Sequence, residues 1–235
     1  DMKSTFKHAS SFNQPIGDWN TSSVIYTDSM FLFATQFNQP LKDWNMSSVT
    51  RMSYMFYSAF SFNQNLNDWD TSSVKHMDWM FNNALLFNGR IDRWAISNVT
   101  HLYAIFRHAK SFNQDISDWN ISSVTGMTEM FAQTLDLSDE NKGKLHEAFS
   151  YNPNWPYDWR EFVVIDDSNF HSAVNLWFDN QAEANATYGH IRDWNVSAVT
   201  NMAEAFMDRT TFNEDISKWD VSNVTTMVRI FYESS

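Results

Sequence analysis

The sequence predicts an α/β solenoid: a right-handed coil with one short strand and one short helix in every 25-residue repeat, its strands paired in a parallel sheet. Three observations support this prediction. Seven tryptophans recur in one register, the apolar spacing changes halfway through each repeat, and aromatic residues make up 17% of the chain. A single strict period of this length indicates one structural unit that is copied and stacked.

The register is defined by tryptophans that lie 25 residues apart, except for one gap of 75. Because stacking places equivalent residues above one another, we expect these side chains to form a core ladder: Trp19, Trp44, Trp69, Trp94, Trp119, Trp194 and Trp219. A polar ladder is expected directly after a repeated Phe, where an amide can bond the backbone of its own turn and of the next. Its members are Asn13, Asn38, Asn63, Asn88, Asn113 and Asn213.

The predicted elements follow from the apolar spacing within one repeat. Val49, Met52, Phe56 and Ala59 recur every three or four residues, which predicts a short helix over residues 49–59. Ser48 or Thr50 can cap its N-terminus. Residues 37–44 lack this spacing and are predicted to be extended. A strand, a crossover helix and a second parallel strand form a right-handed unit, so the repeat predicts a parallel sheet.

Composition excludes several classes of protein. The chain has 20 Phe and 11 Trp but only 19% charged residues, so it is expected to fold around a core. Its net charge of −12 opposes binding to nucleic acid or to an anionic membrane. It has no cysteine for a disulfide or a thiolate metal cluster, and no apolar run reaches the roughly 18 residues of a membrane span. No secretory signal opens the chain, and both ends fall inside a repeat.

The repeat has a specific consensus, F-N-Q-x-[IL]-x-x-W-[ND]-x-S-x-V-T-x-M-x-x-M-F-x-x-A, over residues 1–134 and about 185–235. This motif resembles the BspA-like leucine-rich-repeat surface proteins, also known as the mycoplasma-lipoprotein-type 25-residue repeat. The resemblance implies a leucine-rich-repeat-like coil that is usually exported to cell surfaces or extracellular matrix. Members of that family are associated with adhesion or are uncharacterised, and the resemblance carries over no catalytic residues.

The motif fails between Phe131 and Tyr188, which divides the chain. We predict a first repeat block over 1–134, an irregular and helical junction over 135–168, and a second block over 169–235 that begins with a degenerate repeat. Within the interruption the sequence predicts a helix over 138–149, an irregular stretch over 152–156 because of its two prolines, and a helix that starts near Phe170 after a cap at Asp167 or Ser168. Residues 189–194 are expected to resume the strand. Two degraded but continuous repeats are the alternative to a junction.

Seven Asn-x-Ser/Thr sequences are candidate sites of N-linked glycosylation, because an exported protein can carry glycans there. They are Asn20, Asn45, Asn98, Asn120, Asn185, Asn195 and Asn223. The alternative is that Asn or Asp before Ser simply closes a turn.

Metal and catalytic sites are not expected. Aspartates precede many of the tryptophans, but each turn supplies one carboxylate per position, which favours a solvated acidic edge over a calcium site. No pair of histidines has metal-ligand spacing, and no nucleophile, acid–base pair or phosphate-binding loop is evident. The sequence therefore predicts a protein that is not an enzyme and needs no cofactor.

The predicted working surface is the outward face of the sheet, where residues vary most from repeat to repeat: Pro15, Pro40, Asn65, Arg90, Asp115 and Asp215. The expected function is that of an extracellular structural or adhesive module of a longer surface or fibre protein. One alternative is a receptor-like module that binds carbohydrate or protein on this face. Another is a filament or sheath subunit that assembles with itself through uncapped ends. No nucleic-acid partner and no direct membrane span are expected.

Overall fold

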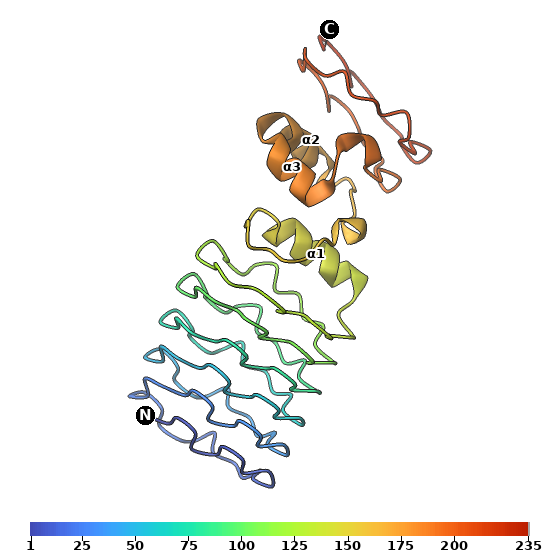
Figure 1. Ribbon diagram of the computed structural model, residues 1–235. Coiled ribbons are helices and arrows are strands. Elements are labelled where there is room, and N and C mark those ends of the chain that lie inside the picture. Colours follow the sequence, from blue (N-terminus) through green and yellow to red (C-terminus); the bar gives the residue numbers. More distant parts are fainter. Residues whose placement is uncertain (235) are drawn as a thin grey trace. The chain divides into compact units, whose positions relative to one another are not determined.

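The computed structural model describes residues 1–234. It divides into two compact units. The first comprises Asp1–Asn141 and Asn152–Pro156, and the second comprises Lys142–Tyr151 and the chain from Tyr157 onward. In the first unit, successive coils of the chain lie side by side, from the blue N-terminal coil to the green ones (Figure 1).

Backbone hydrogen bonds join each coil to the next. Tyr54 N–H donates to the carbonyl of Asp78, and Phe56 N–H donates to that of Met80, both at 2.9 Å. Ser58 N–H repeats the pattern with Asn82 at 2.8 Å. Every second amide of this segment is therefore satisfied by the neighbouring coil.

The amides between them bond within their own coil. Tyr57 N–H donates to the carbonyl of Tyr54 at 3.2 Å, and Ala59 N–H donates to that of Phe56 at 3.0 Å. Both are bonds to the third preceding residue, as in tight turns. Tyr54 and Ser58 have left-handed backbones with φ of 60° and 55°, and the same pair of positions is left-handed in the other coils. Non-glycine residues pay about 1–2 kcal/mol for this conformation, a cost that the bonds between coils offset.

The predicted helix over residues 49–59 is therefore wrong. An α-helix needs right-handed residues and bonds to the fourth preceding carbonyl. A chain of tight turns that closes every three residues produces the same apolar spacing, which is why the pattern was misleading. Ser48 and Thr50 do not cap a helix either, because their hydroxyls donate to the carbonyls of Ser22 and Ile25 in the preceding coil.

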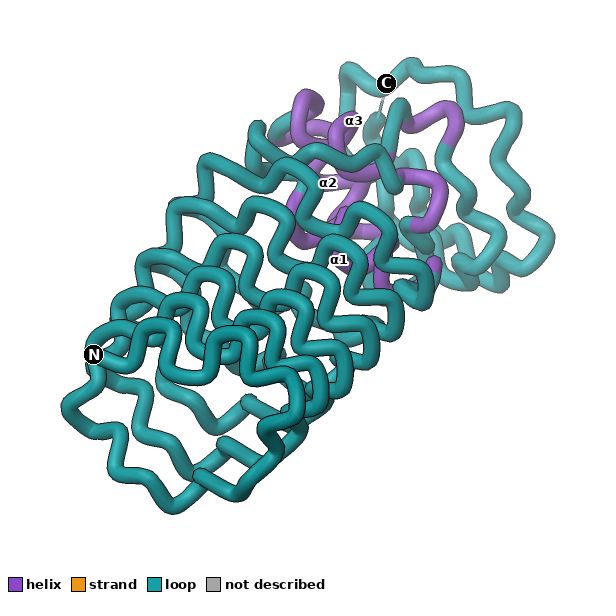
Figure 2. The backbone as a smooth tube through the Cα atoms, turned by 60° about the horizontal axis from the view of Figure 1, so that its bottom comes forward, coloured by secondary structure: helices purple, strands orange, loops and turns teal. Residues whose placement is uncertain are grey.

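The predicted parallel sheet is also wrong. In residues 1–234 the parallel pairing is confined to isolated single-residue bridges, such as Arg51 with His76 and His76 with His101. Figure 2 accordingly draws the coils as loops. The segment expected as a strand, 37–44, is closed by turns: Phe37 N–H donates to Ala34, and Trp44 N–H donates to Leu41, each at 3.1 Å. The repeat is thus a coil of turns, and the expected α/β solenoid is not formed.

Aromatic side chains fill the interior of the first unit. Phe31, Phe56, Phe81 and Phe106 are fully buried and stack coil on coil, with centroids 5.3–5.9 Å apart. Within one coil Phe56 also stacks on Phe62 at 3.9 Å. Burial of one such side chain contributes about 1.5–3 kcal/mol. The repeated apolar positions are the source of cohesion between coils.

The second unit contains helices. The elements in chain order are α1 (Asp139–Phe149), whose first residues belong to the first unit, η1 (Arg160–Phe162), α2 (Phe170–Asp179), α3 (Gln181–Tyr188) and η2 (Ile191–Asp193). The predictions of helices near 138–149 and from Phe170 are confirmed, and α2 buries the expected face of Phe170, Ala173, Val174 and Trp177.

Of three further predictions for the interruption, one is confirmed and two are wrong. Residues 152–156 are irregular, as predicted. The N-cap of α2 is Asn169 rather than Asp167 or Ser168, and its side chain makes no capping bond. Asp167 instead accepts a hydrogen bond from Thr200 N–H at 2.7 Å. The strand expected over 189–194 is wrong, because Ile191–Asp193 is the 3-10 helix η2.

The last part of the second unit again consists of coils like those of the first unit. Trp194 and Trp219 stack with centroids 6.3 Å apart, and Met202 N–H donates to Thr226 at 2.9 Å. Phe206 N–H donates to Ile230 in the same way.

Candidate interaction surfaces

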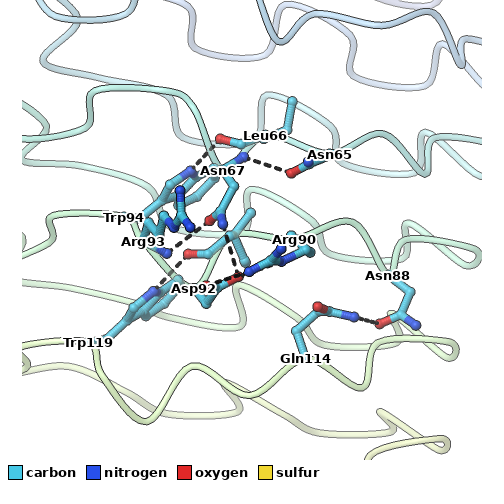
Figure 3. A network of polar contacts seen from close by, with 11 residues as sticks. Asn65, Leu66, Asn67, Asn88, Arg90, Asp92, Arg93, Trp94, Gln114 and Trp119 are labelled. Carbon is cyan, nitrogen blue, oxygen red and sulfur yellow. Dashed lines mark hydrogen bonds and ion pairs between the residues drawn. The ribbon is translucent and has the colours of Figure 1, made fainter.

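The polar ladder joins coils through side chains. The Oδ1 of Asn63 accepts from the backbone N–H of Asn88 at 2.8 Å, and Asn88 does the same for Asn113 at 2.9 Å. Asn88 also accepts from the Nε2 of Gln114 at 2.8 Å (Figure 3). The equivalent bond to Asn63 is missing because Gly89 stands in the Gln position, where a Cβ would lie 2.0 Å from the carbonyl oxygen of Gln64. Asn13 and Asn38 continue the ladder toward the N-terminus, whereas Asn213 is exposed in the second unit.

The tryptophans link neighbouring coils within the core. Trp69 and Trp94 are 3% exposed and stack with centroids 6.1 Å apart. Their indole N–H groups donate to the carbonyls of Leu41 at 2.8 Å and Leu66 at 2.9 Å, each 28 residues earlier. The structure buries six of the seven tryptophans, whereas Trp19 is 40% exposed. Each indole thus combines core packing with a polar bond to the preceding coil.

The glycosylation candidates separate into two groups. Asn20, Asn45, Asn120 and Asn195 are exposed, and their Oδ1 atoms accept from the amide two residues on and so close a turn. The side-chain amides of the other three donate to backbone carbonyls: Asn98 to Ser72, Asn223 to Ser197 and Asn185 to Gln181. Asp70 closes the same turn with Ser72, so this position serves the backbone whether or not it carries a glycan.

All six residues of the predicted working face are exposed: Pro15, Pro40, Asn65, Arg90, Asp115 and Asp215. The sheet that was expected to carry them is absent from residues 1–234. Several of these side chains serve the local backbone, since the carboxylates of Asp115 and Asp215 accept from the amides of Ser117 and Ser217.

A polar network includes Arg90, one of these six residues (Figure 3). Buried Asn67 donates from Nδ2 to Asp92 at 3.1 Å and accepts from the backbone N–H of Arg93 at 2.9 Å. The guanidinium of Arg90 donates two hydrogen bonds, of 3.1 and 3.2 Å, to the carboxylate of the same Asp92. Bonds from the Arg90 guanidinium hold the pKa of Asp92 below its usual range. The network satisfies its own polar groups and so stabilises two coils more than it offers a ligand site.

The aspartates next to the tryptophans remain separate carboxylates. Asp18, Asp43, Asp68 and Asp118 are exposed, and Asp193 pairs with Lys218 at 2.7 Å. Among residues 1–234, no group of three or more His, Asp or Glu side chains is arranged to hold a metal ion.

A second surface of the first unit was not predicted. It is formed by side chains that lie between the buried positions of the segment once expected as a helix. We define the aromatic strip as Phe33, Tyr54, Tyr57 and Trp79. Phe33 contacts Tyr57 with centroids 5.6 Å apart, Tyr57 contacts Trp79 at 6.4 Å, and Tyr54 stacks on Trp79 at 6.0 Å with an interplanar angle of 5°. Phe33 and Tyr54 are 38% and 37% exposed.

The aromatic strip ends in a shallow hollow of about 290 Å³. We call it the strip hollow, and its lining consists of Tyr57, Trp79, Asn82, Asn83, Arg107 and His108. The Nδ2 of Asn83 donates to Ser58 Oγ at 3.0 Å, and Arg107 pairs with Glu129 at 3.0 Å. The Nε of Arg107 is buried and has no hydrogen-bond partner.

Sequence reasoning missed this surface because the segment was interpreted as a helix with a methionine and phenylalanine stripe. That interpretation gave the residues between the repeated apolar positions no predicted role. One signal was available: the phase of Tyr54 and Trp79 is occupied by Ser4, Ser29 and Ala104 in other coils. Large aromatic residues at a position that holds Ser in two other coils point to an exposed role.

The second unit has a hollow of its own, of about 500 Å³, lined by Asp158, Arg160, Glu161, Tyr188, Gly189, His190 and Asp193. Arg160 bonds Asp158 twice at 2.7 Å and lowers the pKa of that carboxyl to about 2. The hydroxyl of Tyr188 donates to Glu147 at 2.8 Å. Burial is the main cause that raises the pKa of Tyr188, and the hydrogen bond to Glu147 adds to it. In this hollow Asp158 and Arg160 are thus paired with each other, and Asp193 is paired with Lys218.

None of the helices among residues 1–234 has the length and apolar character needed to cross a membrane.

Comparison with known proteins gives the chain's family. No curated protein and no solved structure matches the sequence. One family model does, over residues 1–88, 63–151 and 166–235, which together cover most of the chain. The three matches, of which the first two overlap, agree with the presence of a repeat, but they do not show that the chain is a leucine-rich-repeat protein. The chain belongs to the family described as Mycoplasma protein of unknown function, DUF285.

Proposed function

We propose that the chain is an extracellular repeat module of a longer surface protein, and that it presents an interaction surface to a partner outside the cell. The observation that carries this proposal is the contrast between interior and exterior. Buried positions repeat the same Phe, Trp and Met from coil to coil, whereas exposed positions change. A constant scaffold with a variable surface is typical of repeat proteins that bind partners.

The use of the polar side chains supports a binding role over a catalytic one. The Asn ladder and the turn-closing Asn and Asp residues are committed to the backbone. Buried His146 contacts the carbonyl of Ala186 at 2.9 Å, and Tyr188 is bonded to Glu147. The groups that face outward include the aromatic side chains of Phe33 and Tyr54, a residue type that is enriched where proteins bind partners.

The net charge of −12 further favours a protein or carbohydrate partner over nucleic acid. In this proposal the chain acts in adhesion: its coils hold the exposed side chains in fixed positions along a surface.

An antibody raised against the folded chain tests the location. We expect it to label intact cells of the source organism, and we expect external protease to remove the signal. Labelling that appears only after the cells are permeabilised would contradict the proposal.

A further inference from the structure

We propose that the chain forms a two-fold dimer through one face of its first unit, with the aromatic strip at the centre of the interface. The partner is a second copy of the chain, turned so that its coils follow one another in the opposite direction. This inference concerns the chain alone and does not depend on the proposed location.

The face consists of six equivalent segments, one from each coil of the first unit. The amides of each segment bond the carbonyls of the next one, as Ser4 N–H does with Asp28 and Asn83 N–H with Arg107. The segments therefore lie side by side in chain order. We call them segments one to six and their outer surface the striped face: residues 1–9, 26–34, 51–59, 76–84, 101–109 and 126–134.

The striped face carries no net charge, although the chain carries −12 with histidine neutral. Its charged residues are four acidic and four basic, in chain order Asp1, Lys3, Lys7, Asp28, Arg51, Asp78, Arg107 and Glu129. The whole excess of acidic residues therefore lies outside this face. Two copies of an acidic chain repel each other at long range, and this repulsion is smallest when they approach through a neutral face.

The charge of the striped face alternates from segment to segment. Segments one, three and five each carry a net charge of +1, and segments two, four and six each carry −1. In an antiparallel two-fold dimer, segment one lies opposite segment six of the partner copy, two opposite five, and three opposite four. Every positive segment then meets a negative one.

Other arrangements of two striped faces are disfavoured by the same alternation. A parallel arrangement places each segment opposite its own equivalent, so that like charges meet in all six. An antiparallel arrangement shifted by one segment also places like charges opposite each other throughout. Juxtaposed like charges oppose association, so the pattern selects both the direction and the register of the partner copy.

The charged side chains that this pairing uses are accessible. Those of Arg51 and Arg107 are 47% and 34% exposed, and that of Glu129 is 46% exposed. Arg51 also contacts Asp28 at 3.3 Å, and Arg107 contacts Glu129 at 3.0 Å, within one chain. The dimer therefore extends pairs that already exist and leaves no isolated charge in the interface.

The aromatic strip lies where the charge pattern places the two-fold axis. Segments three and four meet at this axis, and they contain Tyr54, Tyr57 and Trp79. Phe33 and Tyr103, which are 38% and 39% exposed, stand in segments two and five, which also face each other. Aromatic side chains are enriched near the centre of protein interfaces, where most of the binding energy resides. The aromatic residues and the charges thus point independently to the same axis.

The chain itself supplies conservative variants for a test. The first pair, Tyr54→Ser and Trp79→Ser, introduces the residue that Ser4 and Ser29 place at the same phase. The second pair, Arg51→Asp and Asp78→Lys, introduces the residues that stand at those phases in the first coil, Asp1 and Lys3. The control is Leu86→Ser, which removes a side chain that is 54% exposed and lies outside the striped face, and which matches Ser61 and Ser111.

Sedimentation velocity on a dilution series of the full chain tests the aromatic centre. We expect the wild type to show a monomer–dimer equilibrium at concentrations up to about 0.5 mM. The dimer Kd should rise about tenfold or more in the Tyr54→Ser/Trp79→Ser double variant and stay within about twofold in Leu86→Ser. Far-UV circular dichroism and thermal unfolding confirm that each variant is folded.

The charge variants test the register. Arg51→Asp alone makes both central segments negative, and Asp78→Lys alone makes both positive, so each variant should dimerise about tenfold or more weakly than the wild type. In an equimolar mixture, the negative central segments of the first variant meet the positive central segments of the second. The mixture should therefore form a heterodimer with a Kd within about threefold of that of the wild-type dimer.

Three results would overturn the inference: the folded wild type remains a monomer at about 0.5 mM, the aromatic double variant dimerises as well as the control does, or the mixture of charge variants forms no heterodimer. None of these results alters the labelling of intact cells, so the proposed location is tested separately.

Discussion

At the scale of the residue, the repeated Asn is a bond between coils, and the number of bonds it accepts differs from coil to coil. Asn88 accepts two, from Asn113 N–H and from Gln114 Nε2, whereas Asn63 accepts one, from Asn88 N–H. A hydrogen bond of this kind contributes about 0.5–1.5 kcal/mol. We expect Asn63→Ala to lower the free energy of unfolding by about that amount and Asn88→Ala to lower it by roughly twice as much. Urea unfolding measures both, and equal losses in the two variants would contradict the ladder as described.

A single buried histidine gives the second unit a dependence on pH. Burial lowers the pKa of His146 below its usual 6.5, although the contact with the carbonyl of Ala186 acts in the opposite direction. In the folded chain the neutral form is therefore favoured, so the stability that it contributes is present above about pH 6.5 and is lost as the pH falls toward the folded-state pKa.

The matching variant is His146→Gln, which keeps a donor but cannot be protonated. We expect the free energy of unfolding of the wild type to fall more steeply from about pH 7 to about pH 5 than that of the variant, by up to about 1.4 kcal/mol per pH unit for one proton. Urea unfolding across this range decides the matter, and parallel curves would show that His146 does not titrate in this way.

At the scale of the element, the coil depends on left-handed residues that are not glycine. Gln133 has a φ of 60° and an exposed side chain, whereas its neighbour Ala132 is not left-handed. Glycine adopts the left-handed region without steric cost, so Gln133→Gly removes about 1–2 kcal/mol of strain from the folded chain. It also favours the unfolded chain by about 0.5–1 kcal/mol, because glycine gives that state more conformational entropy. We expect the variant to be more stable by up to about 1 kcal/mol.

Ala132→Gly is the control, because there the entropy cost is not offset and the chain should lose about 0.5–1 kcal/mol. In a helix both glycines would destabilise. Thermal and urea unfolding that show equal losses in the two variants would therefore favour the helix over the coil.

Sequence patterns predict an element well when only one backbone conformation fits them. The spacing of Phe170, Ala173, Val174 and Trp177 predicts α2 because it continues over two turns and lies outside the repeat. The spacing of Val49, Met52, Phe56 and Ala59 fits both a helix and a series of three-residue turns. What decides between them is pairing with a neighbouring coil 24 residues on, an interaction that helix propensity does not include.

At the scale of the whole chain, the 25-residue period predicts which residues share a phase, and the structure places those of the first unit in successive coils. Burial of Trp44, Trp69, Trp94 and Trp119 follows from that period alone. The aromatic strip could not be predicted from the consensus, because Tyr54 and Trp79 stand at a phase that Ser4 and Ser29 occupy in other coils. A consensus describes what coils share, and the exposed aromatic residues lie where they differ.

Scalar couplings across hydrogen bonds, measured by NMR on the full isotope-labelled chain, test the central claim most directly. The claim is that alternate amides of each coil bond the next coil. It predicts couplings from Tyr54 N–H to the carbonyl of Asp78 and from Phe56 N–H to that of Met80, together with a positive φ at Tyr54. Couplings from these amides to the fourth preceding carbonyls, those of Thr50 and Met52, would show an α-helix and contradict the claim.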